Sequence, residues 1–294
     1  MKNKMSQHDC TSKSEKEYVL TPKLGFLHVV LCVCSAVILC SCIALCEVGW
    51  LQWQTRSRQN NSERDPIRIY IDQGHNPLPH HNNGAEGNGL YEQDLTFDIG
   101  HLLAGLLEED GRFDVRLSRP ERNTVLGTDV VSSLSDRVEG AADFDADYFI
   151  SIHINSYTEP SINGIEAFAA EGDDEAYELG CFLLQGMLDS TSLKNRGVKS
   201  STELYVLQNT DMPAVLLELG FISNAKDAAL LSDSPELFAQ GIYNGISAYF
   251  EASYTQDVNM LLLLIGASAT IVALLSILGT VVRKKACFVP NHKK

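Results

Sequence analysis

Four side chains in the middle of this sequence could together carry out hydrolytic chemistry. His75 and His153 offer imidazole nitrogens, and Glu92 offers a carboxylate. Two histidines and one glutamate are a known zinc-binding set, which leaves one coordination position open for a water whose pKa zinc lowers toward ~7. Glu218 is a second carboxylate, which could accept the proton of that water and pass it on.

The spacing of these residues alone leaves a simpler interpretation open. Their separations along the chain match no short metal-binding motif. Glu218 follows four apolar residues, so its carboxyl group needs either a partner or a catalytic role, unless it lies at an exposed strand end. Polar side chains that only satisfy one another are therefore the alternative to a metal site.

The elements that would position the four residues alternate between strand and helix. A β-branched and aromatic strand at residues 67–71 runs into a turn-rich segment, which places His75 just beyond the carboxyl end of the strand. Apolar residues at helical spacing predict a helix at 90–109, with Glu92 in its first turn. The next nearly continuous apolar strand, at 148–153, ends on His153.

The remaining elements continue this alternation. We expect further strands at 113–117, 164–169, 204–207 and 214–218, and further helices at 134–142, 174–188, 225–231 and from 235 to about 254. This order predicts an α/β fold, a single domain with a mostly parallel central sheet flanked by helices. The carboxyl ends of parallel strands meet at one edge of a sheet, so His75, His153 and Glu218 should lie close together.

Two apolar runs without a charged residue, at 24–46 and 260–282, flank this domain. Each is 23 residues long, which exceeds the ~20 residues that a transmembrane helix needs. Basic residues dominate the tails at 1–23 and 283–294, so the sequence predicts two transmembrane helices with both termini in the cytoplasm. A polar linker at 47–65 would then lead into an extracytoplasmic domain at 66–254.

Charge separates the same regions. The chain carries a net charge of −15, and because the tails contribute +2 and +5, the residues between them carry −22. A middle part this acidic excludes nucleic acid as a partner. Of the eight cysteines only Cys181 lies in the predicted domain, where we expect it to be buried in a helix, so no disulfide is available there. A lipoprotein-like processing box that ends at Cys42 is the minor alternative to an uncleaved first span.

Five ordered segments resemble the zinc-dependent N-acetylmuramoyl-L-alanine amidases of bacterial cell walls. They are DQGH at 72–75, GNGLYEQDL at 87–95, SIHINS at 151–156, NRGVK at 195–199 and MPAVLLELGFISN at 212–224. The resemblance runs from about residue 67 to 250, so it covers the whole predicted domain and leaves the two apolar runs and the tails unexplained.

The resemblance implies both a fold and a reaction. It implies the phosphorylase/hydrolase-like α/β fold, Zn²⁺ bound by His75, Glu92 and His153, and Glu218 as the catalytic acid/base. The substrate would be peptidoglycan, in a bacterial cell wall next to the membrane that holds the two spans. The bond cleaved would be the amide between N-acetylmuramic acid and the L-alanine of the stem peptide. Asn155 and Arg196, which lie in two of the matching segments, are expected to contact the substrate.

The sequence departs from the family pattern around both histidines without removing a ligand. Gln73, Asn76 and Pro77 stand where proline and a glycine pair are usual, and Ile154 stands where a small residue is usual. The bulkier Ile154 could reshape the substrate groove. The loop that carries His80 and His81, which follows His75 in the sequence, could do the same.

Several residues keep alternative interpretations. Glu86 competes with Glu92 as the acidic ligand but lies in a loop rich in glycine and asparagine. His80 and His81 are expected to be solvated, with a second metal or substrate contact as the alternative. Arg119 and Arg137 could orient peptide carboxylates, or could form ordinary ion pairs.

Two other functions fit the same residues. One is a zinc peptidase that cuts within stem peptides, because the same metal chemistry serves any amide. The other is a non-catalytic protein that binds the wall or regulates another enzyme, for which a missing ligand or a missing Glu218 would be the usual sign.

Overall fold

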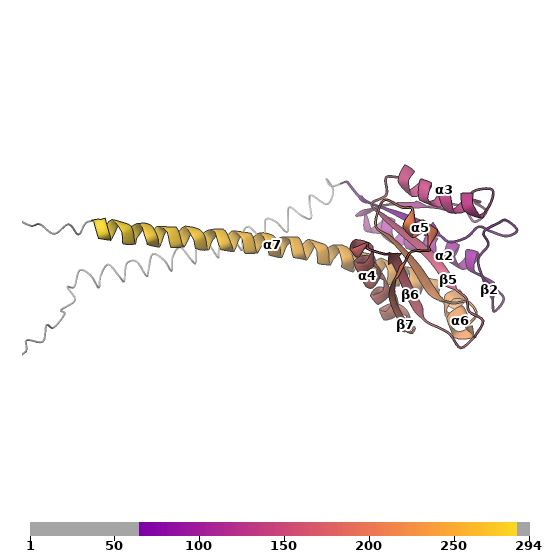
Figure 1. Cartoon of the computed structure of the whole chain (residues 1–294). Helices are drawn as coiled ribbons and strands as arrows, with labels where there is room; N and C mark the ends of the chain where they lie inside the picture. Colours follow the sequence, from indigo (N-terminus) through magenta and orange to yellow (C-terminus); the bar gives the residue numbers. More distant parts are fainter. Residues whose placement is uncertain (1–64, 287–294) are drawn as a thin grey trace, which may run out of the picture. The chain divides into compact units, whose positions relative to one another are not determined.

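The computed structural model describes residues 65–286, which begin with a short strand and end in a long helix (Figure 1). The elements are, in chain order, β1 (Ile67–Gln73), β2 (Glu86–Gly87), β3 (Leu90–Tyr91), α2 (Glu92–Asp110), β4 (Phe113–Leu117), α3 (Val130–Asp143), β5 (Tyr148–Asn155), β6 (Ile165–Ala170), α4 (Asp174–Thr191), β7 (Asn195–Ser201), α5 (Tyr205–Gln208), β8 (Ala214–Phe221), α6 (Ala225–Asp233) and α7 (Pro235–Ala286).

Six strands form one sheet in the order β4-β1-β5-β8-β6-β7. The four strands from β4 to β8 run parallel, whereas β6 pairs antiparallel with β8 and carries β7 parallel to itself. The predicted α/β fold with a mostly parallel central sheet is therefore confirmed. β1, β5 and β8 end at the same edge of the sheet, and this edge is where ligands bind in open α/β folds.

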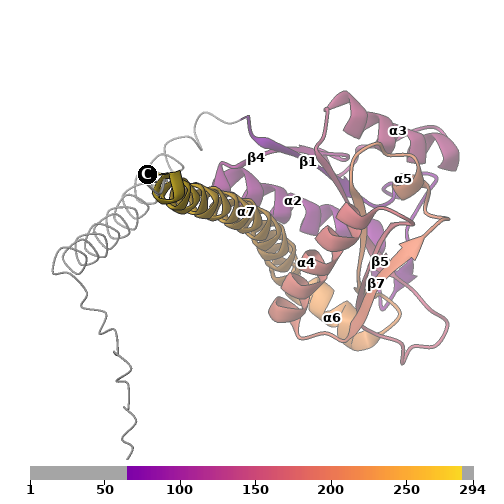
Figure 2. The same cartoon turned by 60° about the vertical axis from the view of Figure 1, so that its left-hand side comes forward.

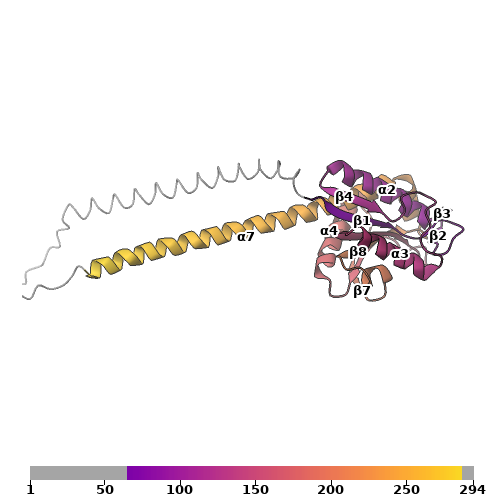
Figure 3. The ribbon, with the colours of Figure 1, turned by 90° about the horizontal axis from the view of Figure 1, so that it is seen from above.

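Helices cover both faces of the sheet (Figures 2 and 3). On one face, α2 and α4 pack against the strands, and the first part of α7 packs against both helices, around a large apolar core that includes Ile99, Leu183 and Phe238. On the other face, α3 and α5 enclose a smaller core around Phe149. The apolar strands β5 and β8 are thus buried from both sides, as continuous apolar runs require.

The structure corrects the sequence prediction in the segment between α4 and β8. The apolar residues at 204–207, predicted to be a short strand, form the single helical turn α5. The strand instead lies earlier, as β7, in a polar segment for which the sequence predicted no strand. β5 and β8 also continue two and three residues beyond His153 and Glu218, so neither residue ends its strand.

The prediction of two transmembrane helices is wrong. Within residues 65–286, no helix is long and apolar enough to cross a membrane. The apolar run at 260–282 does not form a helix of its own, because it continues the 52-residue helix α7, which packs against α2 and α4. The first expected span, at 24–46, lies outside the described residues. The membrane localisation that rested on the two spans is corrected with them.

Candidate metal centre

Three of the predicted site residues converge beyond the parallel strands. Their ligand atoms all lie within 4.8 Å of one another: one imidazole nitrogen each from His75 and His153 and one carboxylate oxygen from Glu92. Oε1 of Glu92 is 3.1 Å from Nε2 of His75 and 3.1 Å from Nδ1 of His153. The two rings are arranged edge to face, with centroids 4.8 Å apart. Residues that are up to 78 positions apart in the chain thus share one small volume.

His75 enters this volume from the turn that follows β1. Its backbone has a φ of 70°, a left-handed conformation that few residues other than glycine adopt. Nδ1 lies 3.2 Å from the carbonyl oxygen of Asn82, which leaves Nε2 facing Glu92. A hydrogen bond of this kind on the second ring nitrogen fixes the tautomer and the ring direction of a metal-binding histidine. Asn82 could not be identified from the sequence, because its role depends on its backbone carbonyl.

Glu92 lies at the first position of α2 and is buried. The amide of Ala85 donates to Oε2 at 2.8 Å, and the amide of Ile154 donates to Oε1 at 2.9 Å. Although burial raises the pKa of Glu92, hydrogen bonds from His153 and His75 outweigh it and hold the pKa well below its ordinary value. Glu92 is therefore an ionised carboxylate that is fixed in place from two sides.

His153 lies within β5, where the neighbouring turn leaves room for its ring only because residue 74 is glycine. A Cβ at position 74 would stand 2.5 Å from Cε1 of His153 and 2.7 Å from the carbonyl oxygen of Ile152. Ile154 is buried in the core, so it does not reshape a groove as the sequence suggested. Gln73 and Asn76 are also fully buried, and their side chains bond to the segments around them.

Glu218 lies next to this cluster, on β8. It is paired with His153 across β5 and β8, and with Glu166 across β8 and β6. Within the described residues, its Oε2 is a buried oxygen without a hydrogen-bond partner. Burial, together with the carboxylates of Glu92 and Glu166, raises the pKa of Glu218 well above its ordinary value, and Lys199 opposes this shift. Glu218 is thus a carboxyl group prepared to hold a proton beside the histidines.

Asn155 and Arg196, the two expected substrate contacts, meet at Glu166. Nδ2 of Asn155 donates to one carboxylate oxygen of Glu166 at 2.9 Å, and Nε of Arg196 donates to the other at 2.8 Å. Lys199 adds a third bond of 2.5 Å. Glu166 is buried and was not singled out from the sequence. The available signal was a carboxylate inside the otherwise apolar strand β6, near a basic segment.

Other residues considered from the sequence lie apart from the cluster. Glu86 is exposed on β2 and does not belong to the group of converging ligands. Cys181 is exposed, which contradicts its predicted burial. Arg119 and Arg137 are fully buried, so neither lies where it could meet a peptide carboxylate in solution.

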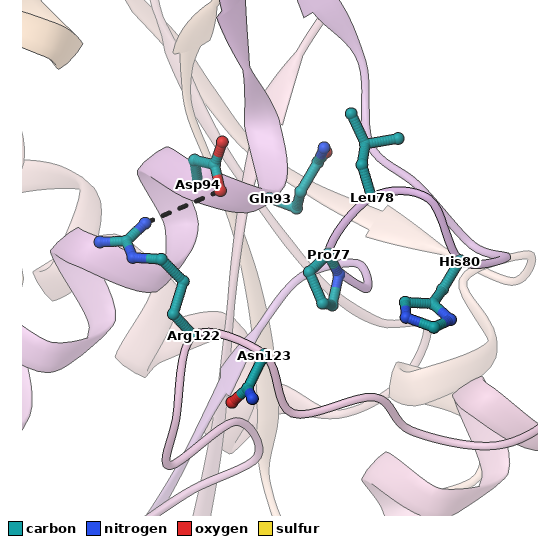
Figure 4. A pocket seen from close by; sticks show the side chains of 7 residues that line it. All are labelled: Pro77, Leu78, His80, Gln93, Asp94, Arg122 and Asn123. Atoms are coloured by element: carbon teal, nitrogen blue, oxygen red, sulfur yellow. Dashed lines mark ion pairs between the residues drawn. The ribbon is translucent and has the colours of Figure 1, made fainter.

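His80 lines a pocket of about 420 Å³, formed by residues that follow His75 and Glu92 in the sequence and by the loop after β4 (Figure 4). The loop after His75 contributes Pro77, Leu78 and His80, α2 contributes Gln93 and Asp94, and the loop after β4 contributes Arg122 and Asn123. Arg122 lies 3.7 Å from Asp94, so its charge is partly compensated there. His81 instead has Nε2 at 3.2 Å from the carbonyl oxygen of Leu126.

The donor set of the cluster fits a zinc ion. Ligands of a tetrahedral zinc ion are separated by about 3.3 Å, since each bond is ~2.0–2.1 Å long. The 3.1 Å between Glu92 and each histidine is close to this separation. Two imidazoles and one ionised carboxylate are also the ligands of known catalytic zinc sites with one open position. Three converging metal ligands beside a carboxyl group of raised pKa are typical of a metal-dependent hydrolase. Here they lie at the edge of an α/β sheet.

Comparison with known proteins identifies the family. The family model described as N-acetylmuramoyl-L-alanine amidase matches residues 69–248. The chain therefore belongs to the N-acetylmuramoyl-L-alanine amidase family and is an enzyme of this family, whose substrate is peptidoglycan.

Two relatives from Bacillus subtilis (strain 168) illustrate the match. The chain is 35% identical to the uncharacterized protein YqiI over 188 residues, which are 62% of this chain and 84% of YqiI. It is 33% identical to the N-acetylmuramoyl-L-alanine amidase LytC over 201 residues, which are 65% of this chain and only 37% of LytC. The similarity to LytC thus concerns one part of a longer protein.

Solved structures of amidases have the same fold. The CwlD amidase from Clostridioides difficile, solved in complex with the GerS lipoprotein, has a TM-score of 0.59 and 27% identity, over 63% of this chain and 99% of that one. The catalytic domain of the amidase CwlV from Bacillus (Paenibacillus) polymyxa var. colistinus has a TM-score of 0.55 and 31% identity, over 63% and 98%.

Proposed function

We propose that this enzyme hydrolyses the amide between N-acetylmuramic acid and the L-alanine of the stem peptide, with Zn²⁺ held by His75, Glu92 and His153. The observation that carries the proposal is the row formed by His153 and Glu218 on adjacent strands, which sets a carboxyl group of raised pKa beside the ligands. When bound, Zn²⁺ would polarise the scissile carbonyl and make a water nucleophilic near neutral pH.

Glu218 is proposed to move the proton. The raised pKa brings this carboxyl group closer to neutral pH, where it can both accept and donate a proton. Oε2 has no partner among the described residues, so it is free to take the proton of the attacking water and to deliver it to the leaving nitrogen of L-alanine. General acid–base catalysis of this kind contributes typically ~10²- to 10⁴-fold to the rate.

Glu92 and the two histidines have a different task. Ionised Glu92 brings a negative charge to the cluster, and backbone amides from the loop at Ala85 and from β5 at Ile154 hold its oxygens. These bonds fix the carboxylate before any metal arrives, which lowers the reorganisation that metal binding requires.

Asn155 and Arg196, which both donate to Glu166, are proposed to contact the substrate beside Glu218. Arg196 uses Nε for Glu166, and its guanidinium lies over the ring of Phe221 at 4.9 Å from the centroid. The η nitrogens of Arg196 would then serve a carboxylate or carbonyl group of the stem peptide, and Glu166 would hold the guanidinium in place.

Product analysis tests this proposal against the two alternatives. The full-length protein is incubated with purified peptidoglycan, and newly exposed amines are identified by their residue. We expect L-alanine amines from the wild type and a ~10²- to 10⁴-fold lower rate from Glu218→Gln. Glu203→Gln, which changes an exposed glutamate, should be unaffected. Amines of other residues would indicate a peptidase, and no release at all would indicate a non-catalytic protein.

A further inference from the structure

Two buried guanidinium groups meet at one backbone atom, the carbonyl oxygen of His75. Nη2 of Arg137, from α3, donates to this oxygen at 2.7 Å. Nη1 of Arg119, from the loop after β4, donates to the same oxygen at 3.3 Å. Both arginines are at most 1% exposed, so these bonds are shielded from water. The backbone of His75, a candidate metal ligand, is thus held by two arginines that do not belong to the cluster.

The surrounding turn is held in the same way, one carbonyl after another. Arg137 also donates to the carbonyl of Gln73 at 2.8 Å, and the hydroxyl of Thr96 donates to the carbonyl of Gly74 at 3.0 Å. This turn needs the support, because His75 has a φ of 70° and its Cβ makes that conformation unfavourable. Without the two arginines, the carbonyl of His75 would lose both of the side-chain donors that hold this conformation of the backbone.

The buried charges of Arg119 and Arg137 differ in how they are compensated, and that of Arg119 disfavours folding. Arg137 forms an ion pair with buried Asp72, but within residues 65–286 no carboxylate pairs with Arg119. Arg119 binds carbonyl oxygens only: besides that of His75, those of Gln93 at 2.9 Å and Arg122 at 3.2 Å. Burial and the charge of Arg137 lower the pKa of Arg119 to about 10, so it stays charged at neutral pH. Burying a cation without a carboxylate partner disfavours folding. This cost points to a purpose of Arg119 other than stability.

The contacts of Arg119 also indicate what that purpose is. Gln93 follows Glu92 in α2, and Gln93 and Arg122 both line the pocket of Figure 4. One guanidinium therefore ties together the turn that carries His75, the helix start that carries Glu92, and the loop on the other side of the pocket. A cation bound to three carbonyls fixes their relative positions more tightly than any apolar side chain could.

We propose that Arg119 and Arg137 are positioning residues of the metal centre, which hold the left-handed backbone of His75 so that its imidazole faces Glu92 and His153. This inference rests on the proposed function, because it assumes that the cluster binds a divalent metal. Neither arginine touches metal or substrate; both act through the carbonyl of His75.

Zinc affinity of the full-length protein tests the proposal. The metal-free protein is titrated with Zn²⁺ in competition with a chelator, well below its unfolding temperature, and folding is monitored by circular dichroism. Lysine keeps the charge but concentrates its donors on one nitrogen, without the planar fork whose separate Nη atoms bind the carbonyls here, so Arg137→Lys and Arg119→Lys should each bind Zn²⁺ about 10- to 100-fold more weakly. If Arg137→Lys does not fold, Arg119→Lys decides alone, because it disrupts no ion pair.

Two control variants separate positioning from general destabilisation. Ser151→Ala removes a 2.8 Å bond to Asp72 from the same network without touching His75. Arg112→Lys makes the same substitution at a half-buried arginine paired with Asp110, away from the cluster. Both should keep the wild-type zinc affinity. The proposal would be overturned if the arginine variants fold and keep the wild-type zinc affinity. It would also be overturned if the control variants lose as much zinc affinity as the arginine variants. A wild-type chain that binds no zinc would instead overturn the metal centre itself.

Discussion

Glu166 and Glu218 stand directly opposite each other across β6 and β8, yet their environments drive their carboxyl groups in opposite directions. Directly paired residues of antiparallel strands point to the same face. Although burial raises the pKa of Glu166, Lys199 and Arg196 outweigh it and hold the pKa below its ordinary value. Burial, Glu92 and Glu166 itself raise the pKa of Glu218. A pair of carboxyl groups separated in this way assigns the roles: Glu166 is a fixed anion, and Glu218 exchanges a proton.

The first prediction concerns Glu166→Gln and the pH dependence of activity. The substitution removes a negative neighbour of Glu218 and leaves the cations Lys199 and Arg196 without their anion, so both changes lower the pKa of Glu218. A base with a lower pKa stays ionised to lower pH. The acidic limb of the kcat/KM profile on peptidoglycan should therefore move to lower pH, while Glu171→Gln, an exposed control just after the end of β6, leaves it in place. A limb that does not move would show that Glu166 does not act on Glu218.

The second prediction is that Glu218→Gln stabilises the metal-free protein while it lowers the rate ~10²- to 10⁴-fold. The folded-state pKa of Glu218 lies above its unfolded value of ~4.3, so the folded state loses stability as pH rises from that value toward the folded pKa. Glutamine carries no charge and escapes this loss. Thermal unfolding in the presence of a chelator should show a gain of about 0.5 to 2 kcal/mol at pH 8 and a smaller gain at pH 5. The reverse order of the two gains would contradict the raised pKa.

The third prediction concerns Asp72, which pairs with Arg137 and accepts a 2.8 Å bond from Ser151. Although burial raises its pKa, Arg137 and His153 outweigh it and keep the pKa of Asp72 low. The stabilisation is therefore present above the unfolded value of ~3.9 and is lost as pH falls through the folded pKa. Asp72→Asn should cost about 3 to 5 kcal/mol at pH 7, because it leaves Arg137 buried and unpaired.

Urea unfolding at two pH values tests the predicted stability cost of Asp72→Asn. The difference between the wild type and Asp72→Asn should be large at pH 7 and should shrink at pH 3. Asp114→Asn, at an exposed position of β4, is expected to change stability by less than about 0.5 kcal/mol at either pH. A constant difference for Asp72→Asn between pH 7 and pH 3 would mean that its ionisation does not stabilise the fold.

The fourth prediction concerns Gly74→Ala. The new Cβ would stand 2.5 Å from the His153 ring and 2.7 Å from a backbone oxygen, so the turn or the ring must move. We expect a loss of about 1 to 3 kcal/mol in stability and weaker zinc binding, measured by thermal unfolding and by chelator competition. Gly105→Ala, on the exposed side of α2 with free space around it, should instead stabilise the protein by about 0.5 to 1 kcal/mol. Unchanged zinc affinity in Gly74→Ala would mean that the close approach of turn and ring is not needed.

The sequence predicted the parts of the molecule whose pattern is local. β5 and β8 are continuous apolar runs, and α2 has apolar residues at helical spacing, so the positions of His153, Glu218 and Glu92 on these elements followed directly. The edge strand β7 was missed because its half-exposed residues are polar and include a glycine. The apolar turn α5 was misassigned because it packs on the face of the sheet beside β8, which no local pattern reveals.

The support of the site was beyond sequence analysis for a similar reason. Asn82 and His75 act through carbonyl oxygens, which carry no residue signature. Glu166 gains its meaning only from cations on another strand. The second apolar run was overinterpreted, since it continues a helix that packs against α2 and α4, and the first lies outside the described residues.

Zinc stoichiometry tests the central claim, that His75, Glu92 and His153 form the metal centre. The full-length wild type, Glu92→Ala and Glu86→Ala are purified, exposed to Zn²⁺ and dialysed, and bound zinc is measured per chain. Glu86 is a suitable control, because it is an exposed acidic residue that precedes Glu92 in the same segment of the chain but does not belong to the cluster. We expect about one zinc per chain in the wild type and in Glu86→Ala, and almost none in Glu92→Ala. Zinc retained by Glu92→Ala, or lost from Glu86→Ala, would contradict the assignment.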